Sequence, residues 1–465
     1  MTIPKFSSLL GVLLLTAATP PSASLAGPQH GPQDGPQDGQ PGWSNWRGPE
    51  LRGTAPGAEG LPTRWSVEEH VVWRTPMPTF SGATPAISGD HIFILSASPP
   101  EPEAPEEPPK GRRRPRRDPG GPEMLLHCLS TTDGAVRWSR SLDEGNELHY
   151  KANRASASPV TDGSHVWTVT GNGTVSAHDF KGELAWSTNL QERWGPFGLL
   201  WGYASSPVLH GDLLIVQVLH GMKTDDPSYI AAFDSKSGEL RWHVERPTDA
   251  PRESPDAYTT PLVIEREGGA ELVITGGDVV TGHALDTGEE LWRVNGLNPR
   301  KATNYRIVPS AVMVGDILVA PTRERPVLAI DTGGAEPLTE EHVRWRWDTR
   351  GGPDVPTPAS DGTHLYMVDD AGLVTCILGA TGEALWGPER TVEGTVSSSP
   401  LLADGKLYIT NEEGITVVLA AGPEFKQLAV NELDGSFTLS SPVAVGDRLY
   451  LRTGDFLYCL AQPKD

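Results

Sequence analysis

The chain has 465 residues, including 51 Gly, 43 Pro and 14 Trp, and its formal net charge is −22. So many helix-breaking residues disfavour a helical bundle and favour short strands joined by turns. The excess of 60 acidic over 38 basic residues repels phosphate backbones, so nucleic acid is not an expected partner.

The first 26 residues have the pattern of a secretory signal peptide. Lys5 precedes an apolar run at 9–18, and the small residues Ser24 and Ala26 suit cleavage after residue 26. The apolar run is too short to span a bilayer, and no cysteine near it could carry a lipid. We therefore expect a periplasmic or secreted protein without a membrane span or a lipid anchor.

Two low-complexity segments are expected to be disordered. Residues 27–42 repeat Gly-Pro-Gln and form a tether, after which 43–70 make an opening segment. Residues 98–123 form a proline-rich insert in which acidic and basic residues balance. Its Arg-rich cluster could bind an anion, but a solvated run is the simpler interpretation.

A repeat of about 40 to 55 residues organises the chain from residue 81 onward. Each copy has a small-residue strand ending in Ser-Pro or its equivalent, a Gly-Asp turn, two apolar strands and a Trp-bearing strand. Residues 203–245 show it most clearly, and segments there alternate with the two-residue period of strands. Such a blade cannot bury both of its faces alone, so the copies must stack around a ring.

Eight first strands can be counted, at 83–88, 156–162, 205–211, 259–265, 309–315, 356–362, 398–405 and 440–447. The last copy is one strand short, and a spare Trp-bearing strand at 71–78 precedes the first. We therefore predict an all-β fold over 71–465, an eight-bladed β-propeller of four-stranded antiparallel blades closed by the N-terminal strand.

Tryptophan and cysteine occupy regular places in the repeat. Because tryptophan recurs in the fourth strands, we expect it to bury large areas between neighbouring blades. The copy at 398–433 lacks tryptophan, so we expect a looser blade there. Cys128, Cys376 and Cys459 lie in apolar third strands and are expected to be buried and reduced.

The stretches FDSKSGELRW (233–242), LDTGEELW (285–292) and ATGEALW (380–386) resemble the Trp-docking repeat of the quinoprotein alcohol dehydrogenases. The same repeat occurs in the assembly protein BamB and in a wide bacterial family of propellers with pyrroloquinoline-quinone-like repeats. The opening residues 43–66 are similar to those of family members without assigned chemistry. The resemblance covers nearly all of 43–462 and implies the fold more strongly than a function.

The enzyme branch of this family implies pyrroloquinoline quinone, calcium and an adjacent Cys-Cys disulfide. This chain has no adjacent cysteines, and the calcium ligands cannot be matched to its residues, so we expect no cofactor and no catalysis. BamB is normally a lipoprotein, and this chain lacks the lipidation cysteine that its anchor would need.

Four long loops should gather at one end of the channel, at 143–154, 191–203, 246–258 and 295–306. They supply the candidate ligand- or partner-binding residues, which are Arg154, Trp194, Phe197, Trp201, Tyr203, Tyr258 and Arg306. The aromatic residues at 194–203 could form an exposed platform, or they could form a small core at the channel mouth. The two arginines could clamp a carboxylate, or they could neutralise acids such as Asp256 or Asp354.

No H-E-x-x-H, calcium-loop, phosphate-loop or G-x-S-x-G pattern occurs. The sequence therefore predicts no metal site, and it favours an exported, monomeric, non-catalytic scaffold that binds a protein or glycan at the long loops. One alternative is a dehydrogenase dependent on pyrroloquinoline quinone and calcium. Another is a glycan-binding surface propeller, and the sequence leaves the identity of the ligand open.

Overall fold

The computed structural model describes residues 1–2, 42–100, 118–349 and 352–463. Nearly all of the predicted signal peptide and of the tether, and most of the insert at 98–123, lie outside these ranges. Chain contacts separate Met1–Pro32 from Gln33–Asp465, and the description below concerns the second unit.

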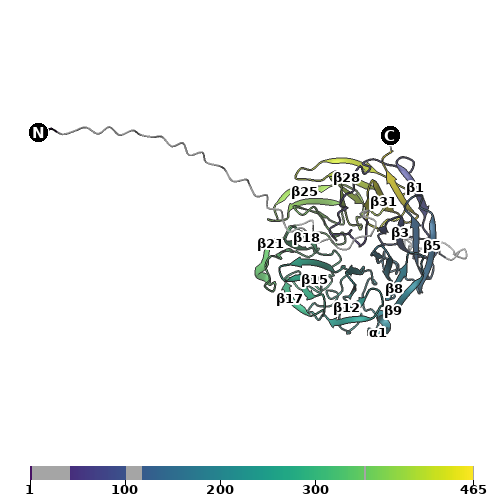
Figure 1. Ribbon diagram of the computed structural model, residues 1–465, viewed down its shortest axis with the longest axis horizontal. Helices are drawn as coiled ribbons and strands as arrows, with labels where there is room; N and C mark the ends of the chain where they lie inside the picture. Colours follow the sequence, from purple (N-terminus) through teal and green to yellow (C-terminus); the bar gives the residue numbers. More distant parts are fainter. Residues whose placement is uncertain (3–41, 101–117, 350–351, 464–465) are drawn as a thin grey trace, which may run out of the picture. The chain divides into compact units, whose positions relative to one another are not determined.

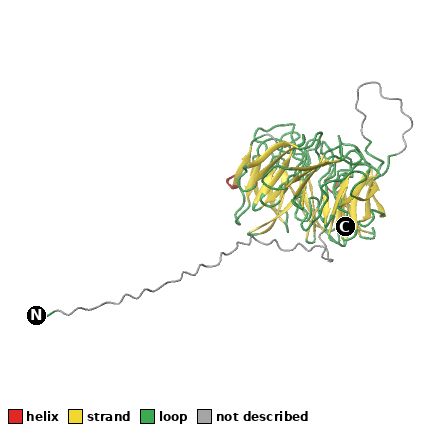
Figure 2. Ribbon diagram, turned by 90° about the horizontal axis from the view of Figure 1, so that it is seen from above, coloured by secondary structure: helices red, strands yellow, loops and turns green. Residues whose placement is uncertain are grey.

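The described residues form eight four-stranded antiparallel sheets arranged in a ring around a central axis (Figure 1). The predicted eight-bladed propeller is therefore confirmed. Within the described residues, helical structure is limited to α1 (Leu190–Trp194) at the periphery (Figure 2) and the 3₁₀ helix η1 (Glu340–His342). No helix in the described ranges is long and apolar enough to cross a membrane.

Each blade contributes one strand to each of four positions from the channel outward. The innermost strands are β2 (Ala86–Ser88), β6 (Val160–Thr161), β10 (Val208–His210), β14 (Leu262–Arg266), β18 (Val312–Val314), β22 (Ala359–Ser360), β26 (Leu401–Ala403) and β30 (Val443–Val445). The second strands are β3 (His91–Ala97), β7 (His165–Val169), β11 (Leu213–Val218), β15 (Gly269–Gly276), β19 (Ile317–Ala320), β23 (His364–Val368), β27 (Lys406–Thr410) and β31 (Arg448–Arg452).

The third strands are β4 (Glu123–Ser130), β8 (Thr174–Asp179), β12 (Tyr229–Asp234), β16 (Val279–Ala284), β20 (Val327–Asp331), β24 (Leu373–Leu378), β28 (Thr416–Ala420) and β32 (Phe456–Ala461). The outer strands are β5 (Val136–Glu144), β9 (Leu184–Asn189), β13 (Leu240–Glu245), β17 (Glu290–Asn295), β21 (Val343–Trp347), β25 (Ala384–Arg390), β29 (Gln427–Asn431) and β1 (Val71–Pro76). The eighth blade has the order β1-β32-β31-β30, so the N-terminal strand closes the ring as expected.

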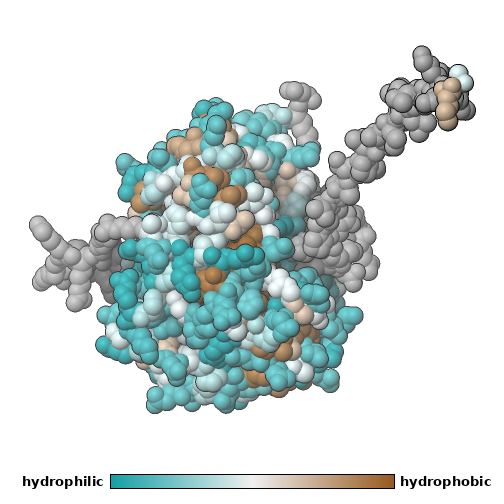
Figure 3. Space-filling view, turned by 90° about the vertical axis from the view of Figure 1, so that its left-hand side faces the viewer, coloured by the Kyte–Doolittle hydropathy of each residue, from teal (hydrophilic) through white to brown (hydrophobic). Residues whose placement is uncertain are grey.

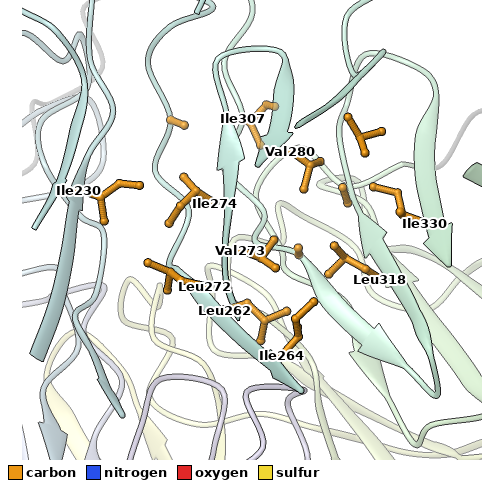
Figure 4. Close-up of a cluster of buried hydrophobic side chains, with 14 of the residues drawn as sticks. Ile230, Leu262, Ile264, Leu272, Val273, Ile274, Val280, Ile307, Leu318 and Ile330 are labelled. Atoms are coloured by element: carbon orange, nitrogen blue, oxygen red, sulfur yellow. The ribbon is translucent and has the colours of Figure 1, made fainter. Parts of the chain in front are cut away.

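The core lies between neighbouring sheets, because both faces of each blade are apolar. Ile274 and Val280 of the fourth blade are fully buried, as are Ile230 of the third and Ile330 of the fifth (Figure 4). The surface seen in Figure 3 is mostly hydrophilic, with apolar side chains scattered on it. All three cysteines are free and buried, and burial raises the pKa of each thiol to about 12.

A ring of eight hydroxyl groups joins the blades around the channel. In each blade a Ser or Thr precedes the Pro that leads into the inner strand; in the fifth blade Ala stands in place of the Pro. This Ser or Thr donates its backbone N–H to the hydroxyl of the equivalent residue in the next blade, at 2.8–3.3 Å. The members are Thr84, Ser158, Ser206, Thr260, Ser310, Thr357, Ser399 and Ser441. The recurring Ser-Pro of the sequence therefore supplies a contact between blades.

Six outer-strand tryptophans dock onto the next blade as expected. Each indole N–H donates to a carbonyl in the turn after the next third strand, at 2.8–3.0 Å; the residues are Trp73, Trp138, Trp186, Trp242, Trp345 and Trp386. Trp292 instead donates to Glu271 at 2.6 Å. At this interface Arg266 makes the contacts with the next blade that tryptophan makes elsewhere. It pairs with Glu271 and donates to three carbonyls of the fifth blade.

The seventh blade, which was expected to be loose, is completed by a residue from the opening segment. Ala429 stands where other outer strands carry tryptophan. Trp65 packs there instead, with its ring 6.2 Å from that of Tyr408, close to the 6.0 Å between Trp73 and Tyr450 in the eighth blade. The structure therefore does not support a looser blade.

Candidate functional site

The four long loops precede inner strands, and a ring contact or hydrogen bonds join each loop to the next at one end of the ring. Glu253 N–H donates to Thr303 and Tyr258 N–H donates to Ile307, which joins the loops at 246–258 and 295–306. We call this surface, built from 143–154, 191–203, 246–258 and 295–306, the long-loop face.

Asp256 organises part of this face from a fully buried position. Its carboxylate accepts the backbone N–H of Leu200 at 2.8 Å and that of Met222 at 3.0 Å. Burial raises the pKa of Asp256 to about 6, although these hydrogen bonds favour its charged form. The carboxyl therefore fixes the loop that carries Trp201.

Trp201 and Tyr150 form an aromatic pair on the surface. Their ring centroids are 5.5 Å apart, and the residues are 39% and 75% exposed. The indole N–H of Trp201 donates to Glu253 at 3.0 Å, and its backbone N–H donates to the Tyr258 hydroxyl at 3.0 Å. Tyr258 thus lies at the predicted site, while Tyr150 was missed because only its loop placement brings it to Trp201.

The other predicted platform residues point inward. Trp194 lies in α1 and stacks on His243 of β13 with centroids 4.3 Å apart. Phe197 stacks on Tyr203 at 4.9 Å, and Tyr203 is 3% exposed, so burial raises its pKa. These three belong to the buried core of the second and third blades and not to an exposed platform.

Both candidate arginines are already paired with acids. Arg306 donates to Asp354 at 2.6 Å, which matches the neutralising interpretation. Arg323 contacts the same carboxylate at 3.1 Å. Arg154 donates to Glu147 at 2.7 Å and to Asn172. Neither guanidinium is held open for a ligand carboxylate.

A lysine of the first long loop reaches across the channel mouth. Lys151, between the first and second blades, places its ammonium 2.7 Å from both Glu412 Oε1 and Ser397 Oγ of the seventh blade. The loop at 143–154 therefore bridges segments that are far apart around the ring.

The opening segment lies in the channel along the inner strands. Trp43 exchanges two backbone hydrogen bonds with Ile87, and the Gly53 carbonyl accepts from Leu402. The Arg47 side chain is buried and donates to Pro400 O at 2.7 Å and Pro358 O at 2.9 Å. Gly53 has a φ of +74°, and a Cβ there would lie 1.8 Å from Arg47 Nη2, so this position requires glycine.

A small cavity borders three of the candidate residues. The cavity beside Arg154, Phe197 and Tyr203 has a volume of about 70 Å³, whereas small-molecule sites commonly have about 300–1,000 Å³. Within the described ranges, no three His, Cys, Asp or Glu side chains gather to hold a metal ion.

A family model and a curated relative that match this chain carry the same description. The family model described as outer membrane protein assembly factor BamB matches residues 65–216, 122–344 and 338–455. A protein of that name from Burkholderia pseudomallei (strain K96243) is 25% identical over 371 residues, covering 72% of this chain and 89% of the relative.

Two solved structures share the fold. BamB from Moraxella catarrhalis superposes with a TM-score of 0.53 at 14% identity, covering 84% of this chain and 99% of that one. Quinohemoprotein alcohol dehydrogenase from Comamonas testosteroni gives a TM-score of 0.60 at 11% identity, covering 91% and 82%. At these identities the likeness concerns the fold alone.

Proposed function

The chain belongs to the family of the outer membrane protein assembly factor BamB, and from that premise we propose that it is an exported, non-catalytic scaffold that binds a protein at its long-loop face. The observation that carries this proposal is the exposed pair of Trp201 and Tyr150, held in place by Glu253 and Tyr258. Aromatic side chains on a rigid support are favoured anchors of protein interfaces.

The contacts of four cationic side chains support binding at the surface rather than chemistry inside the ring. Arg47 donates to the Pro400 carbonyl beside an inner strand, and Lys151 donates to Glu412. Arg154 and Arg306 are paired with acids. We propose that the protein works in the periplasm as a monomer without a resident quinone or calcium ion.

Isolation of the tagged protein from its own cell envelope tests the proposal. We expect a protein partner at a fixed ratio, and expect the Tyr150→Ala/Trp201→Ala variant to reduce that ratio at least about tenfold. A matched control is Leu240→Ala/Leu291→Ala, which removes two exposed apolar side chains from outer strands. Equal recovery with both double variants would contradict the proposal, and displacement of the ligand by soluble polysaccharide would favour the glycan-binding alternative.

A further inference from the structure

A second cavity lies between the first and second blades, toward the outside of the ring. Its volume is about 310 Å³, and its lining includes Arg140 and Leu142 of β5 and Ser176, His178 and Ser187 of β8 and β9. This volume reaches the lower end of the range for small-molecule sites.

His178 lines this cavity without a complete set of hydrogen bonds. The residue is 4% exposed, and its Nδ1 is buried with no hydrogen-bond partner. Burial, followed by the charge of Arg140, lowers the pKa of His178 to about 4, so the imidazole is neutral at pH 7. A buried unpartnered nitrogen is costly unless something at the site satisfies it.

The pairing of third strands with outer strands shows that a histidine at this position is unusual among the eight blades. In each third strand, one residue pairs with the tryptophan position of the outer strand, and His178 is the residue after it in the second blade. In six other blades the equivalent residue is apolar; these residues are Leu129, Phe233, Ile330, Ile377, Leu419 and Leu460. The fourth blade has His283, but both of its ring nitrogens have partners at 2.9 Å. Only His178 combines this position with an unpartnered nitrogen in the described blades.

The corresponding space is filled at the next two interfaces between blades. Between the second and third blades, Trp194 lies against Phe233 and His243, the counterparts of His178 and Ser187. Between the third and fourth, Arg246 donates to Thr281, the counterpart of Ser176. The interface at His178 is therefore an open member of a series whose neighbours are filled by the chain itself.

The charge at the cavity favours an anion. Arg140 donates from Nε, Nη1 and Nη2 to the carbonyls of Gly182, Ser139 and Lys181, at 2.8–3.2 Å. Among the described residues, none of its hydrogen bonds goes to a carboxylate, and only three of its N–H donors are used. A guanidinium carries five such donors, so two remain for a ligand.

Other charged groups near His178 lie at the rim. Asp179 directs its carboxylate to the backbone N–H groups of Lys181 and Glu183. Lys181 and Glu183 are exposed, and Glu183 is the acid that lines the cavity. The half-buried Arg140 is the charged group of the outer strand that faces the imidazole.

We propose that this cavity between the first two blades is a binding site for a small oxyanion, held by Arg140 and His178. A bound carboxylate or phosphate would accept hydrogen bonds from the guanidinium and from a protonated imidazole. Binding would then be coupled to proton uptake at His178, so affinity would rise as pH falls. The site is independent of the long-loop face.

Inorganic phosphate and acetate are suitable probes for the full-length mature protein. With histidine side chains labelled for NMR, we expect saturable binding of at least one probe, together with an upward shift of the pKa of His178. Arg140→Gln is expected to weaken binding about tenfold or more, because it removes the charged donor. Arg241→Gln is the matched control, since Arg241 is also on an outer strand but is paired with Asp234.

His178→Leu provides a second variant that should fold, because leucine stands at the same place in the first blade. It is expected to abolish the pH dependence of binding and to leave thermal stability unchanged or higher. Absence of saturable binding of both probes would overturn the proposal. Binding that leaves the pKa of His178 unmoved, or that Arg140→Gln and Arg241→Gln affect equally, would overturn it as well.

Discussion

The backbone N–H of Ser158 donates to the hydroxyl of Ser206 in the neighbouring blade at 3.0 Å. This contact is repeated between every pair of neighbouring blades, so eight hydrogen bonds of 2.8–3.3 Å join the blades at the inner edge of the ring. Pro159 and Pro207 follow these residues, and a proline fixes the backbone that leads into the inner strand.

Removing one hydroxyl from this ring should destabilise the fold. Ser206→Ala leaves the buried N–H of Ser158 without an acceptor, which should lower the free energy of unfolding by about 1–3 kcal/mol in chemical denaturation. Ser206→Thr is the control, because Thr260 is an equivalent member of the ring. A Ser206→Ala protein as stable as the wild type would show that the ring contributes little.

Trp65 should matter to the propeller although it lies outside every blade. Trp65→Ala removes a buried indole from beside Tyr408 and should cost about 3–5 kcal/mol of unfolding free energy. Adding Ala429→Trp should restore part of the loss, since it returns the missing outer-strand tryptophan. If Trp65→Ala unfolds at the wild-type denaturant concentration, the seventh blade does not depend on the opening segment.

The buried carboxyl of Asp256 predicts a specific pH dependence. Its pKa is about 6 in the folded state, above the ordinary value of 3.8, so the folded protein retains a proton that the unfolded chain releases. This contribution to stability is fully present below pH 3.8 and is lost as pH rises through about 6.

Asp256→Asn has no titrating group at this position. The contributions of all other titrating groups to the unfolding free energy are the same in both proteins, so they cancel when the two are compared at one pH. The wild type should therefore exceed Asp256→Asn in unfolding free energy by more at pH 4 than at pH 7.5. Denaturation at both pH values measures the difference. A gap that stays constant or widens with rising pH would contradict the assignment.

The pairing of Arg154 with Glu147 and of Arg306 with Asp354 predicts an absence of quinone chemistry. Purified protein incubated with calcium and pyrroloquinoline quinone should show neither bound-quinone absorbance nor dye reduction with alcohols or aldose sugars. Stoichiometric binding with turnover, lost in Arg154→Ala or Arg306→Ala, would establish the dehydrogenase alternative instead.

The regular parts of this structure could be predicted because each depends on a repeated local pattern. The two-residue alternation marks the strands, and tryptophans such as Trp242 recur at one place in the repeat. Trp65 could not be placed in this way, because its partner Tyr408 is distant in sequence and no repeat relates the two.

The site was predicted only in part for a similar reason. Loop positions followed from the repeat, but the direction of each side chain depends on contacts with other blades, as between Trp194 and His243. The pairing of Arg306 with Asp354 was one of two interpretations left open by the sequence, and both residues precede inner strands of adjacent blades. Tyr150 has no signal in the repeat, and its exposure depends on the conformation of its loop.

The binding face is tested most directly by photo-crosslinking in the native cell envelope. A benzophenone side chain placed at position 150 should give a defined adduct with one protein, and Trp201→Ala should abolish that adduct. The same group at position 240, on the outer wall, should give none. Equal adducts from the two positions, or an adduct from position 150 that Trp201→Ala leaves unchanged, would contradict binding at the long-loop face.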